Sequence, residues 1–339
     1  MRKRISLKDI AQKLGVSTAL VSYVLNNKRM GRISKEVAAK IKATAIELNY
    51  RPNQIAKSLK ISKTNTIGLI VSNISNPFSS NLARLIEDEA EKNNYTVLFG
   101  SSDENPEKSW KLINIFLNRQ VDGFIIAPAE HSEEHIEYLL KNDIPFVMID
   151  RYYTDLKTSY VTLDNQKGSY LAVKHMAEAG LKKIGMIGFE SSLIHLQDRK
   201  TGFQSALREF GLPHKKSWIR EVNLHVQEAE VEKAIEQLLF SSDPVEAILF
   251  ASNTIANIGV SYINEKGIRV PDQVSLISFD EIPGSNLFYA PLTFIRQPLK
   301  EMGKLATSIL LESIDKNNKV TQIKMEPELV VRKSIRGSN

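Results

Sequence analysis

Polar side chains recur in this chain directly after short apolar runs. They lie at Asn73 to Ser79, Asp150-Arg151, Asp164-Asn165, the loop reaching Arg199, Asn253 and Asp280-Glu281. Carboxylates and amides exchange hydrogen bonds with adjacent hydroxyls, and an arginine spans two oxygens with its planar fork. An aromatic face covers the apolar side of a ring. A single Asp or Asn in such a place is more often a turn residue or a helix cap. As a set, however, these residues predict a site for a neutral, polyhydroxylated ligand.

The elements that must position these groups are alternating strands and helices from residue 64 onward. The expected strands are Ile67–Val71, Thr96–Phe99, Gly123–Ala127, Phe146–Ile149, Val161–Leu163, Ile184–Phe189, Ala247–Ala251 and Val274–Phe279. Amphipathic segments separate them, for example Ser79–Asn93, Pro106–Arg119 and Gly168–Ala179. Continuous apolar runs are typical of parallel strands buried on both faces. The pattern predicts open α/β sheets that bind ligands at the carboxyl ends of their strands or between two lobes.

The positive charge of the chain is concentrated at its N-terminal end. Residues 1–63 hold 15 Lys and Arg against 3 Asp and Glu, a net charge of +12, whereas the whole chain holds 45 against 39. The remaining residues therefore hold 30 against 36, a net charge of −6. A compact basic head on a mildly acidic body indicates that the head binds a polyanion, and nucleic acid is the leading candidate.

Residues 6–49 are predicted to form three short helices. Ser6-Leu7-Lys8-Asp9 resembles a capping box, in which a hydroxyl and an acid three residues later satisfy the free amides at a helix start. Gly15 suits the left-handed conformation of a tight turn. Ser17 and Ser34 are expected to cap the second and third helices.

The first two helices match a helix-turn-helix. Ala11 lets the helices approach, Gly15 follows four residues later, and Val21 is a β-branched core residue six positions after that. The outward face of the second helix then presents groups that can reach bases and phosphates in a major groove, namely Thr18, Ala19, Ser22, Tyr23 and Asn26. The alternative is a plain three-helix, protein-binding bundle. That alternative fits the spacing but leaves the charge of the head unexplained.

Residues 51–63, RPNQIAKSLKISK, form a short basic segment. Pro52-Asn53 can begin a helix, and Ile55, Ala56 and Leu59 fall on one side of it. A two-turn helix is marginal alone in water, so this one would fold when paired with a second copy on DNA. Leu59 would then be free to insert between base steps from the minor groove. The alternative, which the sequence by itself favours, is a passive linker.

The segment LKDIAQKLGVSTALVSYVLNN, followed by ELNYRPNQIAKSLK and TIGLIV, resembles the lac-repressor (LacI/GalR) family of bacterial transcription regulators. The resemblance extends to the C-terminus. It implies that the second helix reads an operator and that Leu59 kinks the operator centre. Tyr23 stands where the family often has arginine or histidine. Tyrosine cannot make the bidentate hydrogen bonds that arginine makes to guanine, so the operator sequences of better-known members cannot be assumed for this chain. The DNA-binding residues that we expect are Ser6, Thr18, Ala19, Ser22, Tyr23, Asn26, Asn53, Ala56 and Leu59.

The body resembles the effector-binding core of the same family, which is similar to periplasmic sugar-binding proteins. The segments ISNPF, MIDR, DRKTGF, ASN and SFDE carry the likeness. It implies an effector cleft lined by Asn76, Phe78, Asp150, Arg151, Arg199, Asn253 and Asp280. RQP, with Gln297, resembles a crossover back into the first lobe. Thr254 stands where the family commonly has aspartate, which removes an expected ligand carboxylate and points away from the family's common sugars.

Other chemistries are set aside. The chain has no cysteine, which excludes disulfides, thiolate metal sites and cysteine nucleophiles. HSEEH, His131 to His135, has zinc-peptidase spacing, but we expect Ser132 to be the N-cap of a helix ending near Asn142, with both histidines in solvent. Neither a phosphate-binding glycine loop nor a G-x-S-x-G motif follows a strand. We therefore expect no catalytic residue, no metal and no cofactor, and we find no export signal or membrane-spanning run.

These patterns predict an all-α helix-turn-helix head and an α/β body of two doubly wound parallel-sheet lobes of the periplasmic-binding-protein type. The expected boundaries are 1–50 for the head, 51–63 for the hinge or linker and 64–339 for the effector-binding and dimerisation body. Its first lobe is expected at about 64–162 and 294–320, and its second lobe at about 163–293 and 321–339.

The function that we expect is that of a homodimeric DNA-binding regulator, by resemblance a repressor. It would bind a palindromic operator under the control of a small, sugar-like effector. We expect it in the cytoplasm, associated with the nucleoid when bound to DNA and not with a membrane. The competing hypothesis is a sugar-binding protein or a carbohydrate-processing enzyme with an incidental basic head. The sequence disfavours it because we find neither an export signal nor a nucleophile–base pair.

Overall fold

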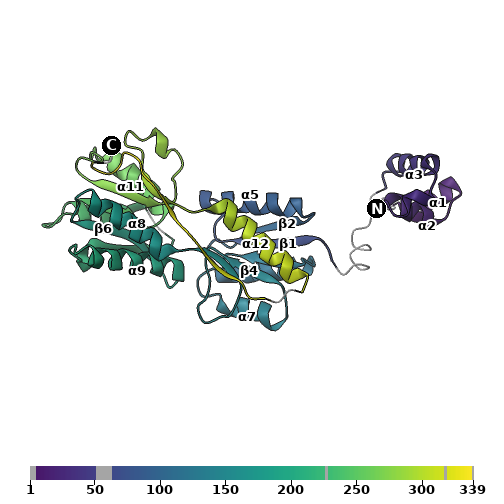
Figure 1. Ribbon diagram of the computed structural model, residues 1–339, viewed down its shortest axis with the longest axis horizontal. Helices are drawn as coiled ribbons and strands as arrows, with labels where there is room; N and C mark the ends of the chain where they lie inside the picture. Colours follow the sequence, from purple (N-terminus) through teal and green to yellow (C-terminus); the bar gives the residue numbers. More distant parts are fainter. Residues whose placement is uncertain (1–4, 51–62, 226–227, 317–318, 338–339) are drawn as a thin grey trace. The chain divides into compact units, whose positions relative to one another are not determined.

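The computed structural model describes residues 5–50, 63–225, 228–316 and 319–337. The chain divides into two compact units, a head unit up to Thr64 and a body unit from Asn65 onward. Figure 1 shows the head unit as a small group of helices and the body unit as sheets flanked by helices.

The head unit contains α1 (Leu7–Leu14), α2 (Thr18–Leu25), the 3-10 helix η1 (Met30–Arg32) and α3 (Lys35–Glu47). The predicted caps are confirmed, because Ser6, Ser17 and Ser34 each accept a hydrogen bond from the backbone N–H three residues later. Gly15 ends α1 in the left-handed conformation, with a φ of 66°. The fully buried side chains of the head core are Ile10, Val21, Val24 and Ile41.

Two six-stranded sheets form the body unit. The first has the order β11-β5-β4-β3-β1-β2, with all neighbours parallel. Its strands are β1 (Thr66–Val71), β2 (Thr96–Ser101), β3 (Gly123–Ile126), β4 (Phe146–Ile149), β5 (Tyr160–Leu163) and β11 (Gln322–Met325). The second has the order β12-β10-β9-β8-β6-β7 and is antiparallel only between β10 and β12. Its strands are β6 (Ile184–Glu190), β7 (Ile219–Asn223), β8 (Ala247–Phe250), β9 (Ser275–Phe279), β10 (Thr293–Arg296) and β12 (Glu328–Val330).

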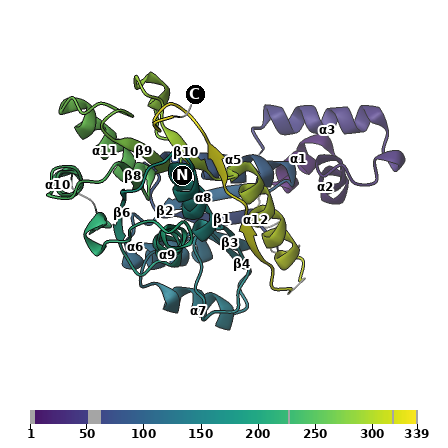
Figure 2. The same cartoon turned by 60° about the vertical axis from the view of Figure 1, so that its left-hand side comes forward.

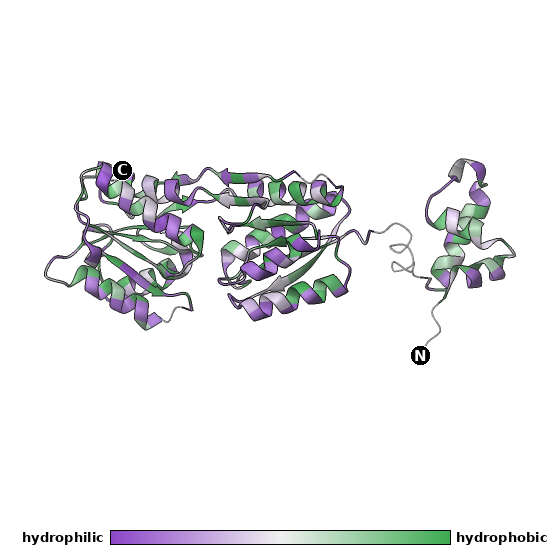
Figure 3. Ribbon diagram, turned by 90° about the horizontal axis from the view of Figure 1, so that it is seen from below, coloured by the Kyte–Doolittle hydropathy of each residue, from purple (hydrophilic) through white to green (hydrophobic). Residues whose placement is uncertain are grey.

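Helices cover both sheets, which confirms the predicted fold class. The helices of the first lobe are α5 (Pro77–Lys92), α6 (Pro106–Asn118), α7 (Glu133–Lys141) and α12 (Leu299–Ile314). Those of the second lobe are α8 (Asn165–Glu178), α9 (Ile194–Glu209), η2 (Lys216–Trp218), α10 (Glu228–Leu239), α11 (Asn253–Glu265) and η3 (Ser285–Leu287). Figures 1 and 2 show α5 and α12 side by side, far apart in sequence but in contact. In Figure 3 the helices carry both hydrophobic (green) and hydrophilic (purple) residues, as expected for helices with one buried face.

The chain passes between the two lobes three times, after β5, after β10 and after β11. The predicted lobe boundaries near 294 and 321 are wrong by a few residues, because β10 pairs with β9 in the second sheet and β11 pairs with β5 in the first. Strand β7, which was not predicted, lies at a sheet edge and is only partly buried. Short segments such as these carry too little apolar pattern to reveal their partners.

Helix α7 begins after Ser132, as predicted, but the Ser132 hydroxyl makes no capping hydrogen bond. The expectation that both nearby histidines are solvated is wrong for His135, which is partly buried and stacks on Trp110 with 5.1 Å between ring centroids. Within the described ranges, no three His, Asp or Glu side chains are grouped as metal ligands would be. None of the described helices combines the length and the apolar character needed to cross a bilayer.

Candidate functional site

The predicted recognition face lies on α2, away from the head core. Thr18, Ala19 and Asn26 are exposed, and Ser22 and Tyr23 are partly exposed. Their spacing places them along one side of the helix. On the other side, buried Val21 and Val24 fix α2 in the core. The head therefore presents five side chains of groove-reading size on one accessible surface.

Sequence reasoning missed a cation next to this face. The Arg29 guanidinium lies 5.0 Å from the centroid of the Tyr23 ring, and Arg29 is exposed. A cation at this distance is attracted to the ring. Tyr23 stands where an arginine or histidine is common in the resembling family, so Arg29 returns a positive charge to this position. At the C-terminal end of α2, the side-chain amide of the C-cap residue Asn26 donates to the Ser22 carbonyl oxygen at 2.8 Å.

The other predicted DNA-binding residues lie outside α2. The Ser6 hydroxyl donates to the Asp9 carboxylate at 2.6 Å and accepts from its backbone N–H, so it belongs to the capping box of α1. Asn53, Ala56 and Leu59 lie outside the described residues, and their roles are proposed from the sequence alone.

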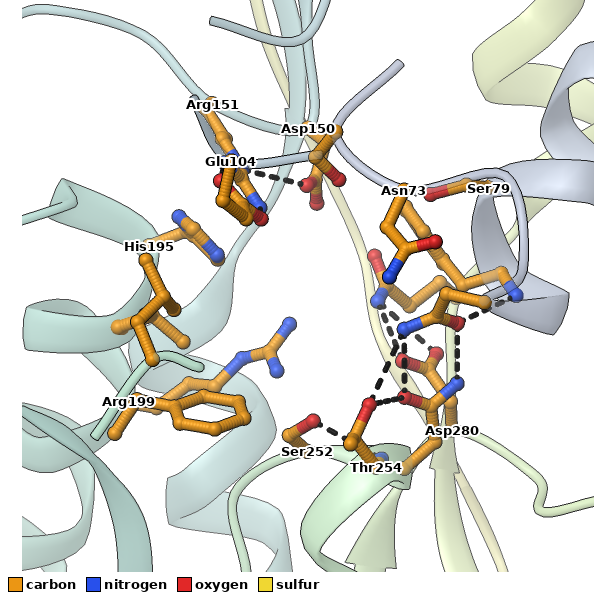
Figure 4. Close-up of a pocket in the computed structure, with 18 of the residues that line it drawn as sticks. Asn73, Ser79, Glu104, Asp150, Arg151, His195, Arg199, Ser252, Thr254 and Asp280 are labelled. Carbon is orange, nitrogen blue, oxygen red and sulfur yellow. Dashed lines mark hydrogen bonds and ion pairs between the residues drawn. The ribbon is translucent and has the colours of Figure 1, made fainter. Parts of the chain in front are cut away.

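All seven predicted effector residues line one cleft between the lobes, with a volume of about 450 Å³. That volume falls within the range of small-molecule sites. The first lobe supplies Asn76, Phe78, Asp150 and Arg151, and the second lobe supplies Arg199, Asn253 and Asp280. Figure 4 shows Asp150 and Arg151 at one side of the cleft, with Arg199 and Asp280 across from them.

Asp150 and Asp280 occupy matching places in the two lobes. Each directly follows a central parallel strand, β4 or β9, and each is left-handed, with φ of 68° and 61°. Aspartate tolerates this conformation better than most residues. Burial raises the pKa of Asp150, and it raises the pKa of Asp280 to about 6 despite the nearby Arg199 guanidinium. The Gln297 amide donates to both oxygens of Asp280, at 3.0 and 3.2 Å.

Arg199, on α9, is 4% exposed and fixed on three sides. Its Nε donates to Asn165 Oδ1 at 2.8 Å, its Nη1 donates to the Ala251 carbonyl oxygen at 2.7 Å, and its guanidinium lies 4.0 Å from the Phe279 ring centroid. Burial lowers its pKa, opposed by the Asp280 and Asp150 carboxylates. The remaining Nη2 group has no protein partner among the described residues, which leaves it available to a ligand in the cleft.

Arg151 is engaged differently. Its two Nη atoms donate to the two carboxylate oxygens of Glu104, both at 2.6 Å, and Nη1 also reaches the Pro128 carbonyl oxygen at 3.2 Å. Its Nε lies 3.4 Å from Asp150 Oδ2. Burial works to lower the pKa of Arg151, but the two carboxylates outweigh it and the pKa is raised. Arg151 is thus held by protein groups rather than presented to the cleft.

Side chains of the two lobes form hydrogen bonds with each other in the cleft and outside it. The Asn76 and Asn253 side-chain amides exchange hydrogen bonds, at 2.8 and 3.1 Å. At a second place, the Glu130 carboxylate accepts from the hydroxyls of Ser191 and Ser192, at 2.9 and 2.7 Å. Two residues predicted to bind a ligand therefore also bind each other.

Comparisons with known proteins show the family and the fold of the chain. Residues 6–53 match the family model of bacterial regulatory proteins of the lacI family, and residues 64–329 match the model of periplasmic binding proteins and the sugar-binding domain of the LacI family. The HTH-type transcriptional repressor PurR of Photobacterium profundum is 31% identical over 336 residues, covering 98% of this chain and 99% of that protein. The chain belongs to the LacI family.

Solved structures show the same fold. The lac repressor dimer bound to operator and the anti-inducer ONPF matches with a TM-score of 0.85 at 23% identity, covering 98% of this chain and 99% of that one. A ribose operon repressor candidate from Burkholderia thailandensis matches with a TM-score of 0.72 at 27% identity. The match covers 78% of this chain and 98% of that one.

Family membership confirms the expected function class. This LacI-family chain is a DNA-binding transcription regulator controlled by a small molecule, and it is not an enzyme. The competing hypothesis of a carbohydrate-processing enzyme is therefore set aside.

The LacI-family cleft of this chain also contains residues that the sequence interpretation did not place in the effector set. They include Glu104, His195, Thr254 and Gln297. Glu104 lies just beyond β2, so the rule that polar residues gather at strand ends could have found it. His195 precedes Arg199 by one turn of α9, so helical spacing could have found it. Thr254 Oγ1 lies 3.4 Å from Asn76 Nδ2.

The raised pKa of Asp280 predicts that the stability of the protein depends on pH. A pKa raised from 3.8 to about 6 means that the folded state holds the proton more tightly than the unfolded chain. Its contribution to stability is present below pH 4 and is lost as the pH rises to about 6, by about 3 kcal/mol. Asp280→Asn removes this loss. Its free energy of unfolding, measured with urea and taken relative to wild type, is expected to rise by about that amount between pH 4 and pH 7. If the free energies of unfolding of the two proteins changed with pH in the same way, the raised pKa of Asp280 would be contradicted.

Proposed function

We propose that this LacI-family protein is a homodimeric repressor that binds a palindromic operator through its two heads and senses a small, sugar-like effector in the cleft. The observation that carries the proposal is the convergence of buried Asp150 and Arg199 and partly buried Asp280, from both lobes, on one cavity of about 450 Å³. The same chain carries a basic helix-turn-helix head. A DNA-binding unit and a small-molecule site in one chain are the parts of a ligand-controlled regulator.

The effector residues have separate roles in this proposal. Asp150 and Asp280 accept hydrogen bonds from ligand hydroxyls, and the free Nη2 group of Arg199 donates one. Phe78 covers an apolar ring face. Asn76 and Asn253 exchange their mutual hydrogen bonds for bonds to the ligand. Arg151 acts through Glu104 and Asp150, whose positions it fixes.

The dimer and the palindrome belong together, because a two-fold protein matches a two-fold site. One matched structure is described as a lac repressor dimer bound to operator, and the matched PurR proteins are described as repressors. On this proposal Thr18, Ala19, Ser22, Tyr23 and Asn26 contact bases and phosphates. A regulator of this kind works in the cytoplasm, associated with the nucleoid when bound to DNA.

Coupling follows from the three passages of the chain between the lobes. A ligand that contacts both lobes favours one relative arrangement of them, and so changes the balance between states with high and low operator affinity. Because the coupling is reciprocal, operator and effector change each other's affinity by the same factor.

The proposal is tested by gel-shift titration of the purified full chain. A palindrome enriched from a random-sequence library is compared with bulk duplex at two salt concentrations, with and without a panel of sugars. We expect a preference of about 1,000-fold or more for the palindrome, binding to both duplexes that weakens with salt, and one sugar that alters only the specific complex. An absence of preference for any palindrome, with or without sugar, contradicts the proposal.

Leu59→Ala tests the proposed role of the segment outside the described residues. A leucine inserted between base steps bends the duplex, so its removal is expected to weaken specific binding about tenfold or more and to reduce bending. Affinity for random duplex should not change, since the basic residues that supply it remain. Circular-permutation gel shifts measure the bend. Unchanged bending by the variant would reject the insertion role and favour a passive linker.

A further inference from the structure

His195 lies in the wall of the cleft without a hydrogen-bond partner. It is 5% exposed, and neither ring nitrogen bonds to the described part of the chain. Its Nδ1 is fully buried and unpartnered. Figure 4 shows the side chain on the same wall as Arg199 and next to Arg151. Buried polar atoms in folded proteins nearly always have a partner, so an unpartnered one at a binding cleft points to a group that arrives with the ligand.

A second unpartnered atom lines the same cleft. The Gln297 Nε2 group donates to Asp280, which leaves Oε1 buried with no partner. That oxygen can only accept, so it requires an O–H or N–H donor. Asp150 and Asp280 add further acceptors to the cleft. The cleft offers these acceptors beside two open donors, the Arg151 Nε and the Arg199 Nη2 group, which together suit a ligand whose hydroxyls both donate and accept.

Neither guanidinium among the described cleft residues carries an uncompensated positive charge for an anionic ligand. Both guanidiniums are opposed by carboxylates, Arg151 by Glu104 and Asp150, and Arg199 by Asp150 and Asp280. His195 does not add a third cation, because burial and the two guanidiniums hold its pKa well below its usual range. A phosphate placed here would meet the two guanidiniums, but also the carboxylates of Asp103, Glu104, Asp150 and Asp280, which outnumber them.

We propose that His195 is a specificity-determining residue, which offers a neutral imidazole to an uncharged, hydroxyl-bearing effector and excludes the phosphorylated form of the same molecule. The inference deepens the proposed function and rests on it. A neutral ring supplies one donor and one acceptor, matching a hydroxyl that both accepts and donates. The four carboxylates that line the cleft outnumber its two guanidiniums and supply the repulsion that rejects phosphate.

Matched pairs of probes test this inference. The pairs are glucose with glucose 6-phosphate, ribose with ribose 5-phosphate, and fructose with fructose 6-phosphate. Each is titrated into the full chain by calorimetry, with thermal melting as a second readout. At least one uncharged sugar is expected to bind at least tenfold more tightly than its phosphate.

Variants of His195 assign the selectivity to the imidazole. His195→Leu is expected to bind the preferred sugar about 10- to 100-fold more weakly, because a ligand hydroxyl loses its partner. Its ligand-free melting temperature should equal or exceed that of wild type, because the unpartnered ring nitrogen is gone. His195→Gln keeps a donor and an acceptor and should lose less affinity. His195→Arg adds a cation and should narrow the difference between sugar and phosphate. His214→Leu, at an exposed histidine outside the cleft, is the matched control and should bind as wild type.

Three results would overturn the inference. One is tighter binding of the phosphorylated member of a pair, and another is wild-type affinity in a folded His195→Leu variant. The third is failure of all six probes to bind, which would show that the cleft takes another class of ligand. Operator preference, measured separately by gel shift, would survive all three results, so failure here is distinguishable from failure of the DNA-binding proposal.

Discussion

Arg199→Ala is expected to abolish the response of operator binding to effector and to lower the free energy of unfolding by about 3–5 kcal/mol. The guanidinium interacts electrostatically with the Asp150 and Asp280 carboxylates, and burial raises the pKa of both. The substitution leaves these two carboxylates without their shared cation and removes the donor proposed for the ligand. Urea denaturation measures the stability, and gel shifts with and without a sugar that binds the wild type measure the response.

The operator affinity of the ligand-free Arg199→Ala variant is expected to match that of wild type, because the substitution lies in the body unit and leaves the recognition face intact. Arg296→Ala is the matched control. Arg296 pairs with Glu328 at 3.0 Å, but their side chains are 48% and 64% exposed, so its loss should cost less than about 1 kcal/mol. Loss of ligand response together with loss of DNA binding would show a folding defect and would contradict the specific role of Arg199.

Glu104→Ala is expected to destabilise the protein by about 3–5 kcal/mol, because it leaves the buried Arg151 guanidinium without its bidentate carboxylate partner. The pair is bidentate at 2.6 Å, and the two side chains are only 14% and 7% exposed. Neighbouring Asp103 provides the control. It pairs with Lys108, but these side chains are 53% and 44% exposed, so Asp103→Ala should cost less than about 1 kcal/mol.

Urea denaturation of Glu104→Ala and Asp103→Ala at pH 7 measures the contrast. Glu104→Met combined with Arg151→Met should recover much of the lost stability, since neither partner is then left as an unpaired charge. Equal effects of the two single alanine variants would contradict the burial argument.

Local features of the head were predictable because their causes lie within a few residues. The hydroxyls of Ser6, Ser17 and Ser34 satisfy amides three positions along the chain, and Gly15 supplies a local backbone conformation. These interactions require no information about distant segments. The parallel sheets were predictable for a related reason, since continuous apolar strands between amphipathic helices have few other ways to be buried.

The candidate cleft was predictable only in outline. Asp150 and Asp280 follow strands, and the ends of parallel strands meet at one edge of a sheet, so their position follows from the pattern. The sequence did not indicate that β10 joins the second sheet and β11 the first, because a four-residue strand has too short a pattern to identify its partner strand. The lobe boundaries were misplaced for that reason.

The sequence by itself determined the basic head, its helix caps, the α/β class and the polar residues that border the cleft, because charge, capping and apolar periodicity act over a few neighbouring residues. Only the tertiary structure decided how those residues are used. In the folded protein Arg151 pairs with Glu104, and Asn76 bonds to Asn253 of the other lobe. The Nδ1 atom of His195 is buried without a hydrogen-bond partner. Burial makes these pairings matter, since an interaction gains strength and an unpaired group gains cost only when water is removed, and which groups lose water depends on segments far apart in the chain.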